Sequence, residues 1–149
     1  MEPSNINMQK WSELIGAFLI NFGAAEMATF QWITKFSSAT ARSSSIDLIL
    51  SKRITLVRQL VEQSSLPDDR KKRALDLWGQ VSELSRTRNI IAHNPLISHT
   101  KDGKTDMGFI NTKKMKGIGP YTIEPLLFAD IARDGSRLAK ILPEIITPF

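Results

Sequence analysis

The fold is decided by one stretch, residues 75–93, which reads LDLWGQVSELSRTRNIIAH. Apolar side chains recur in it at three- and four-residue steps, the spacing of one face of an α-helix. These side chains are Leu75, Trp78, Val81, Leu84 and Ile91. The spacing predicts a long amphipathic helix that packs against other apolar surfaces.

Both ends of this helix carry sequence signals. Pro67 suits a first helical turn, and the two aspartates that follow it favour the positive end of the helix dipole. At the other end Asn94 precedes Pro95, and a proline keeps its predecessor out of the helical region. We therefore expect the helix to end near His93.

Three further helices are expected around it. The first runs from about Asn7 to Phe36 and buries Trp11, Leu14, Ile15, Phe18, Leu19, Phe22, Ala25 and Ile33. After a polar loop at 37–43, Ser44 and Asp47 resemble a capping box. The helix that it opens is expected to bury Ile46, Ile49, Leu50, Leu56, Val57 and Leu60. The last helix opens at Pro125 and buries Leu127, Ile131, Leu138 and Ile141.

Between Pro95 and Pro125 the helical pattern stops. Four glycines punctuate this stretch, and Met107–Thr112 and Tyr121–Glu124 are candidates for two short strands. We therefore expect a single all-α domain over 1–149. It is a four-helix up-and-down bundle with a short loop or β-hairpin insertion, at about 96–124, before the last helix.

Composition excludes several kinds of protein and site. The chain has 149 residues and no cysteine, which excludes disulfides, thiolate metal sites and thiol nucleophiles. Two histidines alone do not make a metal site, and we expect no metal and no cofactor. No run of about 18 uninterrupted apolar residues is present, so we expect a cytoplasmic protein with no membrane partner. The charge of +5 favours an anionic partner such as nucleic acid, or else a mildly basic solvated surface.

Arg88 stands close to the apolar stripe of its helix. It lies in line with Val81, because residues seven apart on an α-helix differ by only about 20°. A guanidinium there needs a partner, and Glu26 is a candidate because it too lies on a mostly apolar face. The pair is either a structural tie between two helices or a carboxylate that orients a functional arginine.

His93 shares a second strip of the helix with Asn89 and Arg86, because these residues are four and seven positions apart. It also occupies the last helical turn, where a histidine commonly caps the helix and interacts with its dipole. The sequence leaves two roles open for His93: a cap of the helix end and a group that takes part in chemistry.

The segment Arg88-Asn89-Ile90-Ile91-Ala92-His93 resembles the signature of the HEPN superfamily. In that family an arginine, often followed by a polar residue, precedes a histidine by four to six residues near the end of a long helix in a four- or five-helix bundle. The first helix, with LINFGAAE at 19–26, is also similar to the opening helix of many members. The resemblance covers most of the chain except 101–121.

The resemblance implies a metal-independent endoribonuclease, acting as a toxin or phage-defence effector with an antitoxin or defence-system partner. His93 suits the base that takes a 2′-hydroxyl proton, Arg88 suits the charged phosphoryl oxygens, and Asn89 suits positioning. Arg88 and His93 lie about 140° apart on one helix, so a homodimer with a composite cleft is expected. Pro95 stands where some toxins of the family carry a tyrosine that a partner enzyme modifies, so this form of regulation is not expected here. Many members only bind RNA or protein, which is the alternative.

The region before the last helix is rich in lysine. Lys113, Lys114 and Lys116, with Lys101 and Lys104 before them, suit an RNA-binding arm together with Arg86. The same run also fits a solvated hairpin. His99 is a candidate for a second general acid.

Overall fold

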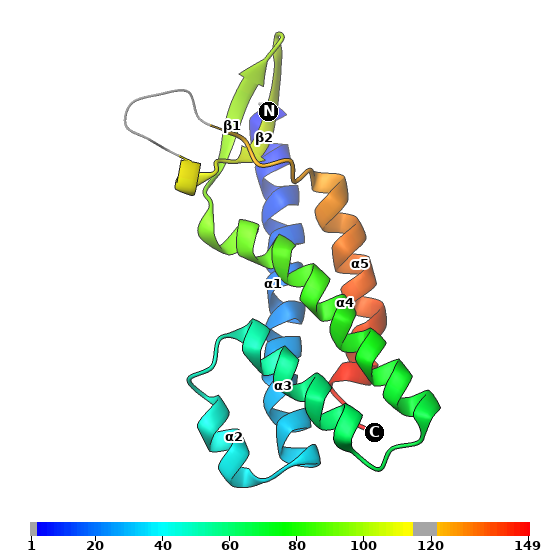
Figure 1. The fold of residues 1–149 in the computed structure, drawn as a ribbon. Coiled ribbons are helices and arrows are strands. Elements are labelled where there is room, and N and C mark those ends of the chain that lie inside the picture. Colours follow the sequence, from blue (N-terminus) through cyan, green and yellow to red (C-terminus); the bar gives the residue numbers. More distant parts are fainter. Residues whose placement is uncertain (1–2, 115–121) are drawn as a thin grey trace.

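The computed structural model describes residues 3–114 and 122–149, with side chains from Met8 onward except those of Ala39 and Lys101. Within this part the chain is mostly helical, with one two-stranded sheet (Figure 1). The elements are α1 Pro3–Phe36, α2 Ala39–Ser45, α3 Leu50–Gln63, α4 Asp68–His93, β1 Leu96–Lys101, β2 Lys104–Phe109, the short 3₁₀ helix η1 Thr112–Lys114, and α5 Phe128–Ile145. The mostly helical class is confirmed.

Helix α1 runs through the whole helical part of the molecule, α5 lies alongside it, and α4 crosses it obliquely (Figure 1). The hairpin of β1 and β2 stands at the end where α1 begins, whereas α2 and α3 lie at the opposite end. Over Met8–Phe36, α1 is long and apolar enough to span a membrane, a test that a buried core helix also passes. Here its Phe18, Phe22 and Trp32 are buried in the helical core.

Two tryptophans form the centre of the core at the α3 end. The rings of Trp32 on α1 and Trp78 on α4 meet edge to face with their centroids 5.7 Å apart. Trp32 Nε1 donates a hydrogen bond of 2.6 Å to the carbonyl of Ile145 at the end of α5. This contact fixes α1, α4 and α5 to one another.

A smaller aromatic cluster attaches the hairpin at the other end. Trp11 on α1 meets Phe109 of β2 and Phe128 of α5, with ring centroids 6.0 and 5.3 Å apart respectively. The hairpin therefore rests on Trp11 in the N-terminal part of α1 and on the start of α5, next to the end of α4.

Helix α4 ends where the sequence predicts and begins one residue later than expected, with Pro67 before its first turn and not in it. Pro67 occupies its N-cap position, Asp68 and Asp69 are in its first turn, and its last residue is His93. Asn94 has the extended conformation that a following proline imposes, with φ −128° and ψ 133°.

The prediction of a loop over 37–43 was wrong. A short helix, α2, begins there, because the side chain of Ser38 accepts a hydrogen bond of 3.2 Å from the backbone N–H of Ala41. Ser44 lies inside this helix and bonds to Thr40, so the expected capping box does not form. Helix α3 begins only at Leu50, and this leaves Ile46 and Ile49 exposed rather than buried.

The predicted strand positions were only partly right, because β2 includes 107–109 whereas β1 lies before both predicted strands. The hairpin turns at Asp102 and Gly103, which both have positive φ (53° and 75°), as a two-residue hairpin turn requires. Its strands therefore come earlier than expected, and among the described residues a single bridge between Ile110 and Ile123 joins the later segments. Tyr121 lies outside the described residues.

Two further predicted core positions, Leu127 and Leu19, are exposed. Leu127 precedes α5, which begins at Phe128 and not at Pro125, and its backbone N–H bonds to the carboxylate of Asp130. Leu19 on α1 is 37% exposed, because the α1 face that carries it is only partly covered.

Candidate functional site

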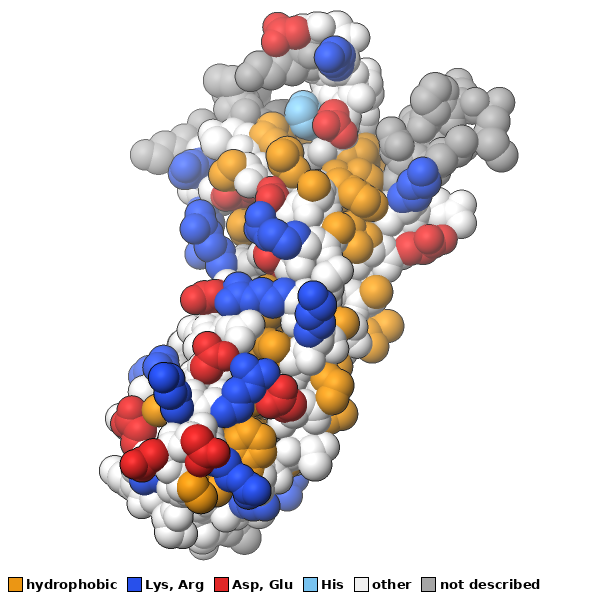
Figure 2. Space-filling model, turned by 90° about the vertical axis from the view of Figure 1, so that its right-hand side faces the viewer, with side chains coloured by type: hydrophobic (Ala, Val, Ile, Leu, Met, Phe, Trp, Pro, Cys, Tyr) orange, Lys and Arg blue, Asp and Glu red, His pale blue; other side chains and the backbone are white. Residues whose placement is uncertain are grey.

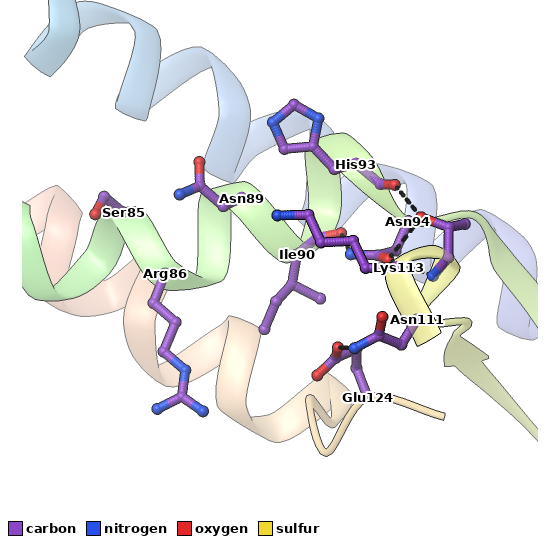
Figure 3. A pocket seen from close by; sticks show the side chains of 10 residues that line it. Ser85, Arg86, Asn89, Ile90, His93, Asn94, Asn111, Lys113 and Glu124 are labelled. Atoms are coloured by element: carbon purple, nitrogen blue, oxygen red, sulfur yellow. Dashed lines mark hydrogen bonds between the residues drawn. The ribbon is translucent and has the colours of Figure 1, made fainter. Parts of the chain in front are cut away.

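The last turns of α4 form one wall of an open pocket of about 590 Å³, called here the His93 pocket (Figure 3). Its α4 residues are Ser85, Arg86, Asn89, Ile90 and His93. They recur at three- and four-residue steps, so they share one face of the helix. The predicted strip of Arg86, Asn89 and His93 is thus brought to one pocket.

The opposite wall comes from Asn94, which directly follows α4, and from the chain after the hairpin. It consists of Asn94, Asn111, Thr112, Lys113 and Glu124. Two backbone hydrogen bonds of 2.8 Å hold this wall, from Asn111 N–H to the Thr122 carbonyl and from Glu124 N–H to the Phe109 carbonyl. The Asn111 amide also donates to the Glu124 carboxylate. Segments more than ten residues apart in sequence are thereby placed against the end of α4.

Side chains of this wall also cap helix α4. The Asn94 amide nitrogen donates to the Ile90 carbonyl at 3.0 Å, and the Asn94 amide oxygen accepts the Thr112 N–H at 3.1 Å. The Thr112 hydroxyl donates to the His93 carbonyl at 3.3 Å. Hydrogen-bond capping therefore comes from Asn94 and Thr112. The imidazole of His93 is exposed and makes no hydrogen bond among the described residues.

The charges of the His93 pocket are mainly positive. Arg86 and Lys113 line it together with His93, and the one carboxylate among the described lining residues is Glu124, which already accepts from Asn111. Figure 3 shows the amine of Lys113 reaching toward Asn89 and His93, while Arg86 points to the side of α5. Such a set can hold a phosphate group and place a base beside it.

Arg88 lies outside the lining of this pocket and contacts α1 instead. Its Nη2 is 3.1 Å from Oε1 of Glu26, and the side chains are 32% and 26% exposed. The Arg88 Nη1 also donates to Asn89 Oδ1 at 3.2 Å. The contact between Arg88 and Glu26 was an open question in the sequence, and it is present. Asn89 is the residue that joins this ion pair to the His93 pocket.

The remaining candidates lie elsewhere. His99 is on β1 opposite Asp106, packed over Gly108, and does not line the His93 pocket. Lys114 is exposed beside the pocket, and Lys104 is exposed at the hairpin turn. Lys116 and the side chain of Lys101 lie outside the described residues. Within the described residues no group of three histidine, aspartate or glutamate side chains could hold a metal ion.

Sequence reasoning named four of the ten lining residues, Arg86, Asn89, His93 and Lys113, as site residues and missed the other six. Asn94 carried a signal, since an asparagine between a helix and a proline commonly caps it. Asn111 and Glu124 carried none, because their pairing depends on how the chain returns after the hairpin.

Comparison of the chain with models of protein families, with curated proteins and with solved structures gave no match. The assignment of a function therefore rests on the residues and geometry of the site.

Proposed function

We propose that this protein is a metal-independent endoribonuclease of the HEPN type, acting in the cytoplasm as a homodimeric toxin or phage-defence effector. Helices α1, α3, α4 and α5 correspond in this proposal to the four helices of a HEPN bundle. The observation that carries it is the His93 pocket. An exposed imidazole there shares an open surface with Arg86, Lys113 and Asn89, next to the Arg88–Glu26 pair.

The chemistry needs a base and positive charge, and the pocket supplies both. His93 takes the proton of an RNA 2′-hydroxyl, and the oxygen attacks the neighbouring phosphorus. The bond to the 5′-oxygen breaks, and that oxygen takes a proton from water. The products are a 2′,3′-cyclic phosphate and a 5′-hydroxyl. Cationic side chains stabilise the charge that develops on the phosphoryl oxygens.

A homodimer accounts for the separation of Arg88 from the His93 pocket. Arg88 faces α1 and lies about 140° from His93 around α4, so the two side chains leave the helix in different directions. In the proposed composite cleft, Arg88 of one subunit serves the phosphate that meets His93 of the partner. Glu26 then acts as a positioning residue that fixes the guanidinium.

The test is cleavage of mixed RNA in excess EDTA. Wild-type protein should produce 5′-hydroxyl ends, and His93→Ala should lower the rate by about 10²- to 10⁴-fold, the range for loss of a general base. Arg88→Ala should lower it by a similar factor. His99→Ala and Arg42→Ala are matched controls, because His99 lies away from the pocket and Arg42 is exposed on α2. Equal rates for wild type and His93→Ala would overturn the proposal.

The toxin role has its own test. Expression of the wild-type protein should arrest growth, and His93→Ala should relieve the arrest while keeping the wild-type melting temperature. A folded His93→Ala protein with full toxicity would remove His93 from the mechanism. A co-expressed antitoxin or defence-system partner should relieve the arrest by the wild type.

A non-catalytic RNA-binding module is the second candidate. It is favoured by one observation, that Glu26 neutralises Arg88 and holds it outside the pocket lining. This candidate predicts salt-dependent RNA binding that Lys113→Ala and Arg86→Ala weaken, with no cleavage by the wild type.

A further inference from the structure

Helix α1 exposes an apolar face that no other described part of the chain covers. Ile20 is 76% exposed and Met27 is 58% exposed, although both lie inside a long, well-formed helix. Gly16 precedes these two residues and Gly23 lies between them. At both glycines, no neighbouring atom lies within 4 Å of the position that a Cβ would occupy. Only 28% of the most apolar window of α1 is buried. Figure 2 shows a run of hydrophobic side chains down the right-hand side of the face drawn there, with most of the charged ones to its left.

These four residues form a single stripe, called here the α1 stripe. At 100° per residue, Gly16, Ile20, Gly23 and Met27 fall within about 60° of one another around the helix. No charged residue occurs from Leu14 to Ala25. The stripe is therefore a narrow, uncharged ridge about 16 Å long, in which small and large residues alternate.

We infer that the α1 stripe is the surface through which two copies of this chain pair, with their α1 helices antiparallel. A two-fold axis midway between Ile20 and Gly23 brings Ile20 of one copy over Gly23 of the other, and Met27 over Gly16. Each large side chain then meets the open space above a glycine. The order small, large, small, large is self-complementary on reversal, as a two-fold interface requires.

The residues of the α1 stripe favour a second copy of this chain as its binding partner. A second copy presents a surface of the same neutral character, so no like charges meet at the centre of the contact. The glycines have no side chains, which allows two helix backbones to approach closely. A membrane would instead have to accommodate Lys10, Glu13 and Glu26 on the same helix, and would separate α1 from the core that buries its opposite face.

The pairing has a consequence for the His93 site, and this consequence rests on the proposed function. Glu26 directly precedes Met27 at the edge of the stripe, and Glu26 holds Arg88. Antiparallel pairing therefore places the Arg88–Glu26 pair of each copy beside the interface, as a composite cleft needs.

The first test replaces exposed apolar residues with glutamate and measures mass by light scattering over a range of concentrations. Wild type should be a dimer that dissociates on dilution. Ile20→Glu and Met27→Glu should be monomers with unchanged melting, because both side chains are already exposed. Ile46→Glu is the matched control, since Ile46 is 62% exposed but lies after α2, and it should remain a dimer. A monomeric wild type, or a dimeric Ile20→Glu, would overturn the inference.

The second test measures register with introduced cysteines, which have no background because the chain has no cysteine. Gly16→Cys/Met27→Cys should form a disulfide-linked dimer under mild oxidation. The two positions are about 16 Å apart within one helix, so they cannot bond to each other in one chain. Neither single variant should cross-link when the helices are antiparallel. Efficient cross-linking of Gly16→Cys alone would mean parallel helices and would overturn the register.

Two further outcomes distinguish failure of the proposed pairing from failure of the proposed nuclease function. Flotation of wild type with phospholipid vesicles, lost in Ile20→Glu, would mean that the stripe binds a membrane, and would overturn the inference. A cross-linked double variant that never cleaves RNA would instead leave the pairing intact and reject the proposed nuclease.

Discussion

The two halves of helix α4 differ in what their side chains contact: the first half carries apolar side chains into the core, and the second presents polar ones to an open pocket. In the first half, Ala74, Leu77, Trp78 and Val81 are buried against α1, α3 and α5. In the last two turns, Arg86, Asn89 and His93 face an open pocket, and only Thr87 and Ile91 remain buried. The first half holds the domain together, and the second presents exposed polar groups on that rigid support. Stability and function should therefore respond to different substitutions.

The largest expected effect is on stability, in the core against which the first half of α4 packs. Trp32→Ala removes the ring that contacts Trp78 and should lower the free energy of unfolding by about 3–5 kcal/mol. His93→Ala should change it by less than about 0.5 kcal/mol, because the side chain is exposed and makes no described bond. Urea denaturation of both variants measures the contrast. A large loss of stability in His93→Ala would contradict the view that the second half of α4 contributes little to the stability of the fold.

The second-largest expected effect is a difference in stability between variants of the two core tryptophans. Trp32→Phe leaves the buried Ile145 carbonyl without its hydrogen bond, which costs about 1–3 kcal/mol. Trp78→Phe instead removes an indole N–H that is buried with no partner among the described residues. Both variants lose ring volume, so Trp32→Phe should be the less stable of the two by denaturant titration. The reverse order would mean that Trp78 Nε1 is satisfied.

A smaller effect concerns the end of α4. Thr112→Val removes the hydroxyl that bonds to the His93 carbonyl and should cost about 1 kcal/mol. The readout is faster hydrogen exchange of the amides in the last turn of α4, with the amides around Trp78 unchanged. Thr55→Val, an exposed threonine whose hydroxyl bonds within its own helix, is the control. Equal protection in both variants would show that η1 does not stabilise the helix end.

The smallest effect is at the start of α4. Arg73 donates two hydrogen bonds, of 2.9 and 2.6 Å, to the carboxylate of Glu144 on α5, and they hold the pKa of Glu144 below its usual value. A lowered pKa means that the pair stabilises the fold above the ordinary glutamate pKa and ceases to do so as the pH falls through the lowered value. Melting temperatures of wild type and Glu144→Gln should differ slightly at neutral pH and converge in acid. The difference is small because both groups are exposed to solvent.

Local signals predicted those features that depend on neighbouring residues. The apolar spacing of α1 and α4 indicated their buried faces, and the Asn94-Pro95 pair indicated where α4 ends. The wrong assignments came from competing local signals. Ser38, rather than Ser44, supplies the helix cap, and the Asp102-Gly103 turn sets the strands earlier than the apolar residues suggested.

The sequence by itself determined the long helices, the end of α4 at His93, and the separation of Arg88 from His93 around that helix. These follow from helix periodicity and from proline stereochemistry, which act over a few residues. Only the tertiary structure decided that Glu26 reaches Arg88, that Asn111 and Glu124 close the pocket, and that one face of α1 stays uncovered. Those facts depend on which elements pack together, because packing joins residues whose separation along the chain carries no local signal.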